Sequence, residues 1–326
     1  MREFDLIRRL QEIICIADAP HAKGCTLGIG DDAAVFDPPA GRQIVACTDS
    51  LVESVHFHAD TSAASIGHKA LAVNLSDLAA MGAEPAWFLL SLSIPHTKQD
   101  WLESFARGMA DLARESGILL AGGDVTSGPL NVCVTALGLV EPGQAIRRSG
   151  ARPGDSVVVS GRPGAAAHAL QVLEAGGVPD ARDRSALEFP QPRLRLGRSL
   201  QGMATACIDI SDGLLADLGH ILEASGAGAE LDVQSLPCPE SMASLPRRER
   251  WPLQLAGGDD YELCFTVPAA AKRRLEAVSA SSGAELTVIG SITAEPGLVV
   301  RDPDGGRLEA PTTGWEHFRE TGGAAP

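Results

Sequence analysis

Aspartates that follow small residues recur along the chain, and they are the residues most able to do chemistry. The segment Gly28-Ile29-Gly30-Asp31-Asp32 places two adjacent carboxylates beside glycines and directly ahead of an apolar run. Adjacent like charges repel by about 1 kcal/mol or more at a protein surface, so a cation, backbone amides or open water must offset them. The pattern returns at Thr48-Asp49, Ser76-Asp77, Gly123-Asp124, Asp209-Ile210-Ser211-Asp212 and Gly258-Asp259-Asp260. We expect strand ends to deliver these carboxylates to a shared rim that holds divalent metal ions.

A set of carboxylate ligands favours hard cations such as Mg²⁺, which keeps part of its water shell and is often shared with substrate phosphates. This chemistry indicates an enzyme that handles nucleotides. The sequence has no G-x-x-x-x-G-K-[ST] loop and no G-x-G-x-x-G turn after a strand, so it predicts neither a P-loop nor a Rossmann site. Any phosphate groups would therefore be held through metal ions.

Composition argues against several other functions. The chain has 326 residues, 44% of them hydrophobic, which is enough for two domains with their own cores. It carries 27 Lys and Arg against 42 Asp and Glu, a formal charge of −15 that argues against a nucleic-acid partner. No apolar run reaches the ~18 residues that a membrane span needs. Met1–Ala17 alternates charged and apolar residues at helical spacing, which predicts an amphipathic helix and no signal peptide.

The cysteines indicate a reducing compartment. All seven are scattered along the chain without a C-x-x-C pair, mostly in apolar, strand-like stretches. Such cysteines are typical of buried free thiols in the cytosol. The sequence therefore predicts a soluble, cytoplasmic protein with no membrane partner.

Strand-like and helical stretches alternate in both halves of the chain, which predicts a mixed α/β and α+β fold with two domains. A stretch rich in Pro and Gly over residues 141–155 favours a boundary there, with domains at 1–142 and 143–326. In the first half, the patterns predict a buried strand over Gln43–Thr48 that ends at Asp49, and a long helix over Ala63–Met81. The other predicted strands cover residues 87–94, 118–120, 130–140, 156–160, 206–210, 229–233, 261–267, 286–292 and 298–301, and the other helices 99–116, 165–175, 193–203, 214–225 and 269–282.

Taken in order, the motifs of this chain resemble those of the thiamine-monophosphate kinases. The resemblance extends from near Met1 to the tail Gly314-Trp315-Glu316-His317-Phe318, and so many ordered motifs make it specific. The segments that carry it are Gly28-Ile29-Gly30-Asp31-Asp32, Thr48-Asp49, the run from Lys69 to Ala83 with Asn74-Leu75-Ser76-Asp77, Gly122-Gly123-Asp124, Arg148-Ser149-Gly150-Ala151, Asp209-Ile210-Ser211-Asp212-Gly213-Leu214 and Asp260-Tyr261-Glu262-Leu263-Cys264-Phe265.

The resemblance implies an ATP-dependent enzyme of the aminoimidazole-ribonucleotide-synthetase-like superfamily. Such enzymes pair an N-terminal α/β domain, whose strands join those of a second subunit in a homodimer, with a larger C-terminal α/β domain. The implied reaction moves the γ-phosphoryl group of ATP to the phosphate of thiamine monophosphate, giving thiamine diphosphate and ADP, the last step of thiamine diphosphate biosynthesis. ATP is the implied co-substrate and several Mg²⁺ ions are the implied cofactors, with a monovalent cation as a further candidate.

The resemblance also assigns roles to residues by matching position. The implied metal ligands are Asp32, Cys47, Thr48, Asp49, Asp77, Asp124, Asp209 and Asp212, with Cys47 and Thr48 acting through backbone oxygen or the Thr hydroxyl. The implied ATP contacts are Gly123, Asp124, Arg148 and Ser211. The implied contacts to the thiamine portion are His56, Asp259 and Trp315.

The implied chemistry agrees with the residue types. Phosphoryl transfer depends on positioning and on neutralising oxyanions, and metal ions held by carboxylates cancel the repulsion between two phosphorylated anions. The acceptor phosphate has a second pKa of about 6, so it is largely ionised near neutral pH and no acid or base side chain is required. Asp49 and Asp124 are then the most critical residues. An acidic pocket with Trp315 suits the thiazolium cation of thiamine.

Two positions depart from the family pattern, and two rival functions stay open. Asp259 stands where many relatives have Glu, and Cys47 stands where Ser is expected. The first rival is a superfamily relative that makes selenophosphate or serves hydrogenase maturation, for which Cys25 and the thiol-free tail give no convincing reactive cysteine. The second is a non-catalytic acidic protein that binds divalent cations without nucleotide. A pyrophosphokinase acting on free thiamine would be recognised by release of AMP.

Overall fold

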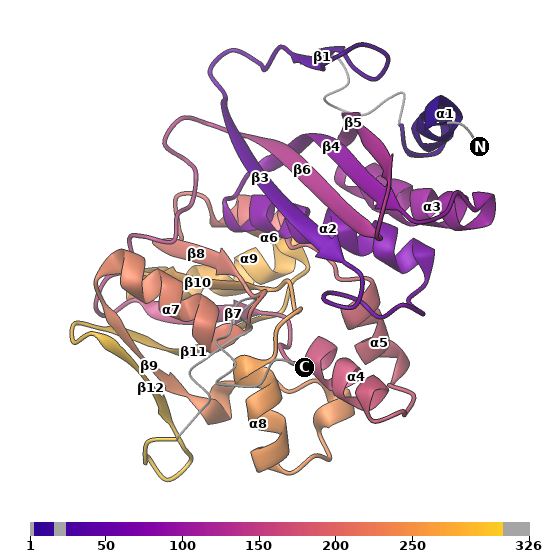
Figure 1. Ribbon diagram of the computed structural model, residues 1–326. Coiled ribbons are helices and arrows are strands. Elements are labelled where there is room, and N and C mark those ends of the chain that lie inside the picture. The colour runs from indigo at the N-terminus through magenta and orange to yellow at the C-terminus, as the bar shows by residue number, and fades with distance from the viewer. Residues whose placement is uncertain (1–2, 16–23, 309–326) are drawn as a thin grey trace, which may run out of the picture. The chain divides into compact units, whose positions relative to one another are not determined.

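The computed structural model of the chain describes residues 3–15 and 24–308 (Figure 1). Two compact units are present, and each is described by itself. The first contains residues 1–147, 188–204 and 274–284, and the second contains residues 148–187, 205–273 and 285–326. The single domain boundary expected after residue 142 stays a prediction. The first unit also contains two short segments from later in the chain, residues 188–204 and 274–284.

The first unit is built on a four-stranded sheet with the order β3-β6-β4-β5. Its strands are antiparallel except for β4 and β5, which are parallel. The sheet therefore mixes both kinds of pairing, as a mixed α/β and α+β fold requires. The elements of this unit are α1 (Glu3–Ile14), β1 (Cys25–Leu27), β2 (Val35–Phe36), β3 (Gln43–Val52), α2 (Ala63–Ala80), β4 (Glu84–Ile94), α3 (Gln99–Ser116), β5 (Leu119–Ser127), β6 (Asn131–Val140), α6 (Leu194–Leu200) and α9 (Leu275–Ser282).

Helix α2 is the buried centre of the first unit. It begins at Ser62, whose side chain accepts a hydrogen bond from the backbone N–H of Ser65, the usual device for capping a helix start. Nearly all of its residues are buried. It packs against α3 at very short range, because a Cβ on Gly67 would lie 2.1 Å from the carbonyl oxygen of Phe105. Together α2 and α3 cover one face of the sheet, which we call the inner face (Figure 1).

The opposite face of the sheet, which we call the outer face, is covered only in part. Near β4, the ring of Phe36 packs on that of Trp87, with centroids 4.8 Å apart, and Trp87 is completely buried. Toward β3 the cover ends among the described residues, and Ile44 is 45% exposed. The outer face of β3 and β6 is therefore open to solvent in the chain by itself.

The second unit is built on a six-stranded sheet with the order β12-β9-β11-β7-β10-β8. All its neighbouring strands are antiparallel except β9 and β12. Helix α7 packs against this sheet, and Leu214, Leu218 and Ile221 on α7 join its apolar core. The elements are β7 (Ser156–Ser160), α4 (Ala165–Glu174), α5 (Ala181–Glu188), β8 (Ala206–Asp209), α7 (Leu214–Ser225), β9 (Gly228–Asp232), η2 (Val233–Ser235), η3 (Glu240–Met242), α8 (Arg247–Ala256), β10 (Leu263–Val267), η4 (Ala269–Arg274), β11 (Leu286–Thr293) and β12 (Gly297–Arg301).

Several expected elements differ from the observed ones. The strand expected to end at Asp49 continues to Val52, and the run at 118–120 is the start of a strand that continues to Ser127. The apolar run over residues 130–140 predicts a strand that is buried on both faces. This prediction is wrong, because the residues of β6 alternate between buried and half-buried as far as Leu137. Helices α5 and α8 were not predicted, and the helix expected over 269–282 begins as the 3-10 turn η4. No helix within residues 3–15 and 24–308 is long and apolar enough to cross a membrane.

Candidate active site

In the first unit, the side chain of Cys47 on β3 interacts with Asp49 on the same strand and with Asp77 near the end of α2. The backbone N–H of Asp49 donates to Oδ1 of Asn74 at 3.1 Å, and Sγ of Cys47 donates to the carbonyl oxygen of Asn74 at 3.3 Å. Burial raises the pKa of the Cys47 thiol, and the negative charges of Asp77 and Asp49 raise it further. Two of the predicted metal ligands, Asp49 and Asp77, therefore lie close enough to the Cys47 side chain to raise its pKa.

The side chain of Cys47 is poorly suited to Mg²⁺. Its raised pKa keeps it a neutral thiol, and Mg²⁺ prefers oxygen ligands. The hydroxyl of Thr48 lies on the outer face, where it contacts Oγ1 of Thr135 at 3.0 Å, because successive side chains of a strand point to opposite faces. Beside Asp49, these two residues can therefore offer only their backbone oxygens.

Asp124 lies on β5, at the opposite edge of the same sheet from Asp49. Its register partner is Ser91 on β4, which in turn pairs with Cys133 on β6. Cys133 contacts Oγ1 of Thr48 at 3.5 Å on the outer face, so Asp124 belongs to the outer face too. Neighbouring strands are spaced by about 4.8 Å, so about 14 Å separates β3 from β5 within one sheet. One chain alone does not bring Asp124 to Asp49 through this sheet.

Asp32 lies on an exposed turn, where its N–H donates to Oδ1 of Asp31 at 2.9 Å. His56 follows β3, and its Nδ1 accepts a hydrogen bond from the N–H of Val52 at 3.0 Å. Trp315 lies outside the described residues. Within the part of the chain that the structure describes, no three His, Cys, Asp or Glu side chains form a complete metal-binding group.

In the second unit, the predicted ligands Asp209 and Asp212 flank a tight turn between β8 and α7. Asp209 is the last residue of β8, which ends one residue before the expected end of the strand at Ile210. The carboxylate of Asp217, in the first turn of α7, accepts hydrogen bonds at its Oδ2 from the backbone N–H groups of Ser211, Asp212 and Gly213, at 3.0, 3.1 and 3.0 Å. Asp217 was not identified from the sequence, although an aspartate four residues after the Ser-Asp-Gly turn is a recognisable sign of a helix start.

Burial raises the pKa of the Asp217 carboxyl to about 7, and the charges of Asp209 and Asp212 contribute to that rise. The N–H groups of Gly213 and Asp212 act in the opposite direction, because hydrogen bonds to the ionised form stabilise it. Asp209, Asp212 and Asp217 therefore interact electrostatically with one another across this turn. The turn therefore concentrates negative charge where the sequence predicted metal binding.

The segment that carries Asp259 is joined to the same turn. The N–H of Asp259 donates to the carbonyl oxygen of Ser211 at 2.9 Å, and Oδ1 of Asp259 accepts a hydrogen bond from the hydroxyl of Tyr261 at 2.9 Å. Both Asp259 and Tyr261 have positive φ, 69° and 50°, a conformation that side chains other than glycine adopt only where the surroundings impose it. The structure thus brings the predicted substrate contact Asp259 beside the predicted ATP contact Ser211.

Helix α7 holds a third predicted segment at its other end. Oγ of Ser225 accepts hydrogen bonds from the N–H groups of Gly150 and Ala151, at 3.1 and 3.2 Å, and donates to the carbonyl oxygen of Arg148 at 3.4 Å. The side chain of Arg148 is exposed. The motif that contains Arg148 is therefore fixed by the same helix whose first turn fixes Ser211 and Asp212.

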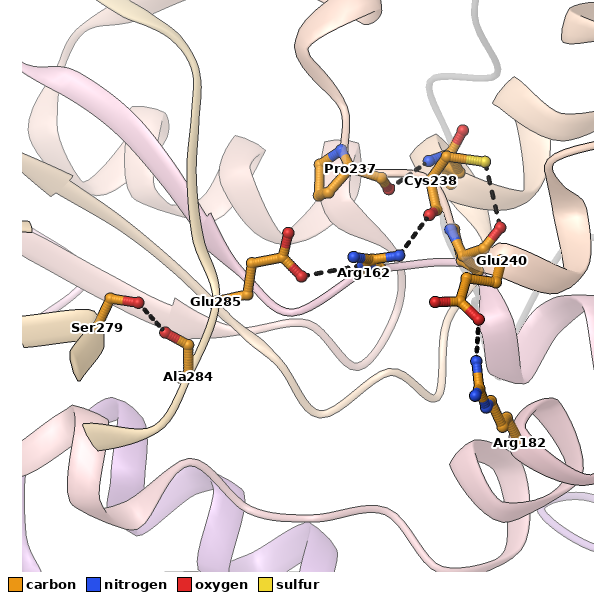
Figure 2. A network of polar contacts seen from close by, with 10 residues as sticks. Arg162, Arg182, Pro237, Cys238, Glu240, Ser279, Ala284 and Glu285 are labelled. Carbon is orange, nitrogen blue, oxygen red and sulfur yellow. Dashed lines mark hydrogen bonds and ion pairs between the residues drawn. The ribbon is translucent and has the colours of Figure 1, made fainter. Parts of the chain in front are cut away.

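A cavity of about 300 Å³ in the second unit lies apart from the predicted residues. Arg162, Arg182 and Glu240 are among its lining residues. Figure 2 shows that both guanidinium groups are engaged: Arg162 donates to Glu285 at 2.9 Å and to the carbonyl oxygen of Cys238 at 3.3 Å, and Arg182 pairs with Glu240. Because Arg162 and Arg182 are each paired with a glutamate, they are poorly suited to bind a phosphate group in this cavity.

Comparison with known proteins places the chain in a class. The family described as AIR synthase related protein, N-terminal domain, matches residues 30–140, and the corresponding C-terminal domain family matches residues 152–303. The chain belongs to the AIR synthase related proteins. It is 42% identical over 300 residues to the thiamine-monophosphate kinase of Escherichia coli K12, which covers 90% of this chain and 92% of that protein. Within that class, the chain is a member of the thiamine-monophosphate kinase family.

Solved structures agree with this assignment. The crystal structure of thiamine-monophosphate kinase from Stenotrophomonas maltophilia K279a superposes with a TM-score of 0.85 at 44% identity, covering 94% of this chain and 98% of that chain. A second structure, described as AaThiL complexed with AMPPCP and TMP, gives a TM-score of 0.76 at 29% identity, covering 98% of this chain and 99% of that chain. The predicted two-domain synthetase-like fold is therefore confirmed over nearly the whole length.

Proposed function

We propose that this protein transfers the γ-phosphoryl group of ATP to the phosphate of thiamine monophosphate, giving thiamine diphosphate and ADP. The observation that carries the proposal is the 42% identity to a thiamine-monophosphate kinase over 90% of the chain. A relative described as complexed with AMPPCP and TMP supports the binding of a nucleotide and a second phosphorylated compound by this chain. The residues that the sequence predicted for ATP and metal, Ser211 and Asp212, stand on one turn beside Asp259, which supports joint binding of nucleotide and acceptor.

Mg²⁺ fits the donor set of this chain. The available ligands are carboxylates and backbone oxygens, which suit a hard cation. Asp77 lies in the last turn of α2, where the helix dipole disfavours a carboxylate, and a bound cation would offset that cost. The residues that would hold Mg²⁺ are Asp32, Asp49, Asp77, Asp124, Asp209 and Asp212, with backbone oxygens of Cys47 and Thr48. Bound Mg²⁺ neutralises phosphate oxygens during the transfer.

The chain's own residues bind and orient the substrates and supply no acid or base. Gly123, Asp124, Arg148 and Ser211 are proposed to contact ATP, and His56, Asp259 and Trp315 the thiamine portion. Asp259 is one methylene shorter than the Glu of many relatives, but its Oδ1 is held by Tyr261 and its backbone by Ser211. A fixed short side chain can still present a carboxylate to a cationic ligand.

We further propose that the protein is a homodimer whose first units pair through their sheets. Strands β3 and β5 are the two edges of the four-stranded sheet in the described residues, and unpaired edges readily take up another strand. The outer face beside β3 is open and carries the exposed Ile44. All seven cysteines are free thiols, and two of them are fully buried, which supports a cytoplasmic location.

The test is to incubate the protein with ATP, Mg²⁺ and thiamine monophosphate and to measure thiamine diphosphate and ADP. We expect equal amounts of both products, and none without Mg²⁺. Formation of thiamine diphosphate from free thiamine with release of AMP would instead identify a pyrophosphokinase. Divalent-metal binding without nucleotide binding would identify a non-catalytic protein. Loss of turnover after cysteine alkylation, with ATP binding intact, would return a thiol mechanism to consideration.

A further inference from the structure

We propose that Asp217 is a positioning residue: its carboxylate fixes the backbone of the turn Ser211–Gly213, on which a proposed metal ligand and a proposed ATP contact stand. The proposal rests on the proposed function for the roles of Ser211 and Asp212, and on geometry for the rest. One oxygen, Oδ2 of Asp217, accepts three consecutive backbone N–H groups within 3.1 Å. Three donors on one oxygen restrict the turn far more than a single hydrogen bond does.

The turn needs such an acceptor because it lies at the start of a helix. Ser211, Asp212 and Gly213 precede Leu214, the first residue of α7, so their N–H groups cannot bond to carbonyl groups within that helix, and a backbone N–H left without an acceptor is costly. Asp217 is only 2% exposed, and a buried carboxylate is costly unless it is hydrogen-bonded. The carboxylate therefore accepts the hydrogen bonds that the N–H groups of the turn need, and these N–H groups offset the cost of burying the carboxylate.

The geometry extends from the turn to Asp259. The carbonyl oxygen of Ser211 accepts the N–H of Asp259, so the Ser211 residue is held on its N–H side by Asp217 and on its carbonyl side by the next segment. The approach is close, because a Cβ on Gly258 would lie 2.3 Å from that oxygen. A change at Asp217 is thus expected to displace both the Asp212 and the Asp259 segments.

A purely structural cap would make a different prediction from a positioning residue. Removing a cap lowers the melting temperature and leaves metal and nucleotide binding in the folded protein unchanged. Removing a positioning residue also weakens the binding of the ligand whose contacts it aligns. The matched control is Asp155, another buried aspartate of the second unit, 5% exposed, whose Oδ2 accepts the N–H of Arg152 at 3.0 Å and the hydroxyl of Thr205 at 2.7 Å.

The experiment compares Asp217→Ala, Asp217→Asn and Asp155→Asn with the wild type. Amide hydrogen exchange of the metal-free proteins comes first, and we expect loss of protection at residues 211–213 in both Asp217 variants but not in Asp155→Asn. Calorimetric titration with Mg²⁺ and a non-hydrolysable ATP analogue comes second. We expect affinity to fall about tenfold or more in the Asp217 variants, as for other residues that orient metal ligands, with KM for ATP rising more than kcat falls. Asp217→Asn keeps the side-chain size and serves if Asp217→Ala does not fold.

Folded Asp217 variants with unchanged protection at 211–213, or with binding no weaker than that of Asp155→Asn, would overturn the proposal. The two proposals fail separately. If the wild type makes no thiamine diphosphate, the proposed function is wrong, whereas hydrogen exchange and calorimetry still decide the role of Asp217.

Discussion

Asn74 ties the edge strand β3 to helix α2, because its Oδ1 accepts the N–H of Asp49 while its Nδ2 donates to the carbonyl oxygen of Ala70. Its side chain is completely buried. We expect Asn74→Ala to lower the free energy of unfolding by about 1–3 kcal/mol, since it leaves buried polar groups unpaired, and to raise the Mg²⁺ concentration for half-maximal activity. Urea denaturation and a Mg²⁺ titration measure the two effects. Gln99→Ala, which removes only an exposed contact to Glu103, should be neutral; equal stability of the two variants would refute the bridging role.

Asp49 and Asp124 are exposed in the chain by itself, so their charges are expected to serve binding more than packing. We expect Asp49→Asn and Asp124→Asn to lower kcat by at least about 100-fold, more than loss of an orienting partner would, with melting temperatures close to that of the wild type. Asp111→Asn, which alters an exposed carboxylate paired with Arg114, is the control for charge alone. Turnover at the wild-type rate in either site variant would remove that residue from the metal-binding set.

The buried carboxyl group of Asp260 is expected to make the free energy of unfolding depend on pH. Its Oδ1 accepts the N–H of Gly164 at 2.8 Å, while the buried Oδ2 has no hydrogen-bond partner among the described residues. Burial raises the pKa of this carboxyl well above its usual value, and the charges of Glu262, Asp259 and Asp217 add to the rise. A carboxyl with a higher pKa in the folded state binds more protons there, so the free energy of unfolding falls as pH rises above the unfolded value of about 4.

We therefore expect Asp260→Asn to flatten this decline. The measurement is the melting temperature of the metal-free protein at several values between pH 5 and pH 8. The change of melting temperature with pH in Asp260→Asn is compared with that of the wild type and of Asp111→Asn. A loss of stability that is the same at every pH therefore does not affect the conclusion. Identical slopes in all three proteins would mean that Asp260 titrates normally in the folded state.

Gly123 is required by close backbone packing as well as by its proposed contact to ATP. Its φ is 149°, and a Cβ there would lie 1.8 Å from the carbonyl oxygen of Leu90 on the neighbouring strand. We expect Gly123→Ala to cost about 3 kcal/mol or more, since both the backbone conformation and the strand pairing oppose it. Gly143→Ala is the control, because Gly143 has a φ of 78° with nothing within 4 Å, and it should cost only about 1 kcal/mol. Similar losses of stability in denaturant would contradict the steric explanation.

The sequence predicted the acidic segments well where local signals decide the structure. At Asp209 an apolar run leads into a Ser-Asp-Gly turn, and the strand ends within one residue of the expected end at Ile210. Near Asp49 and Asp124 the end of the apolar run predicts the end of the strand. This prediction is wrong, because β3 continues to Val52 and β5 continues to Ser127. Asp49 and Asp124 lie on edge strands with a solvent-facing side, where polar residues continue a strand without interrupting it.

Other features depend on contacts between distant parts of the chain and leave no local pattern. Helix α8 contains Pro252 and several charged residues, which argue against a helix until its packing is known. The face on which Thr48 lies follows from the register of β3 with β6, which the sequence does not specify. The role of Asp217 depends on the backbone conformation of the turn Ser211–Gly213, which directs three N–H groups toward its carboxylate.

The interleaving of the two units has a consequence for the order of synthesis. Helices α6 and α9 belong to the first unit, and α6 approaches α2 so closely that a Cβ on Gly197 would lie 2.0 Å from the carbonyl oxygen of Ala79. The ribosome must therefore release residues up to 200 before α2 can pack against α6, and residues up to 282 before α9 can pack against α6. A nascent chain halted after residue 147 would expose the surface of α2 that packs against α6, and co-translational folding of the first unit would finish only when most of the second has already emerged.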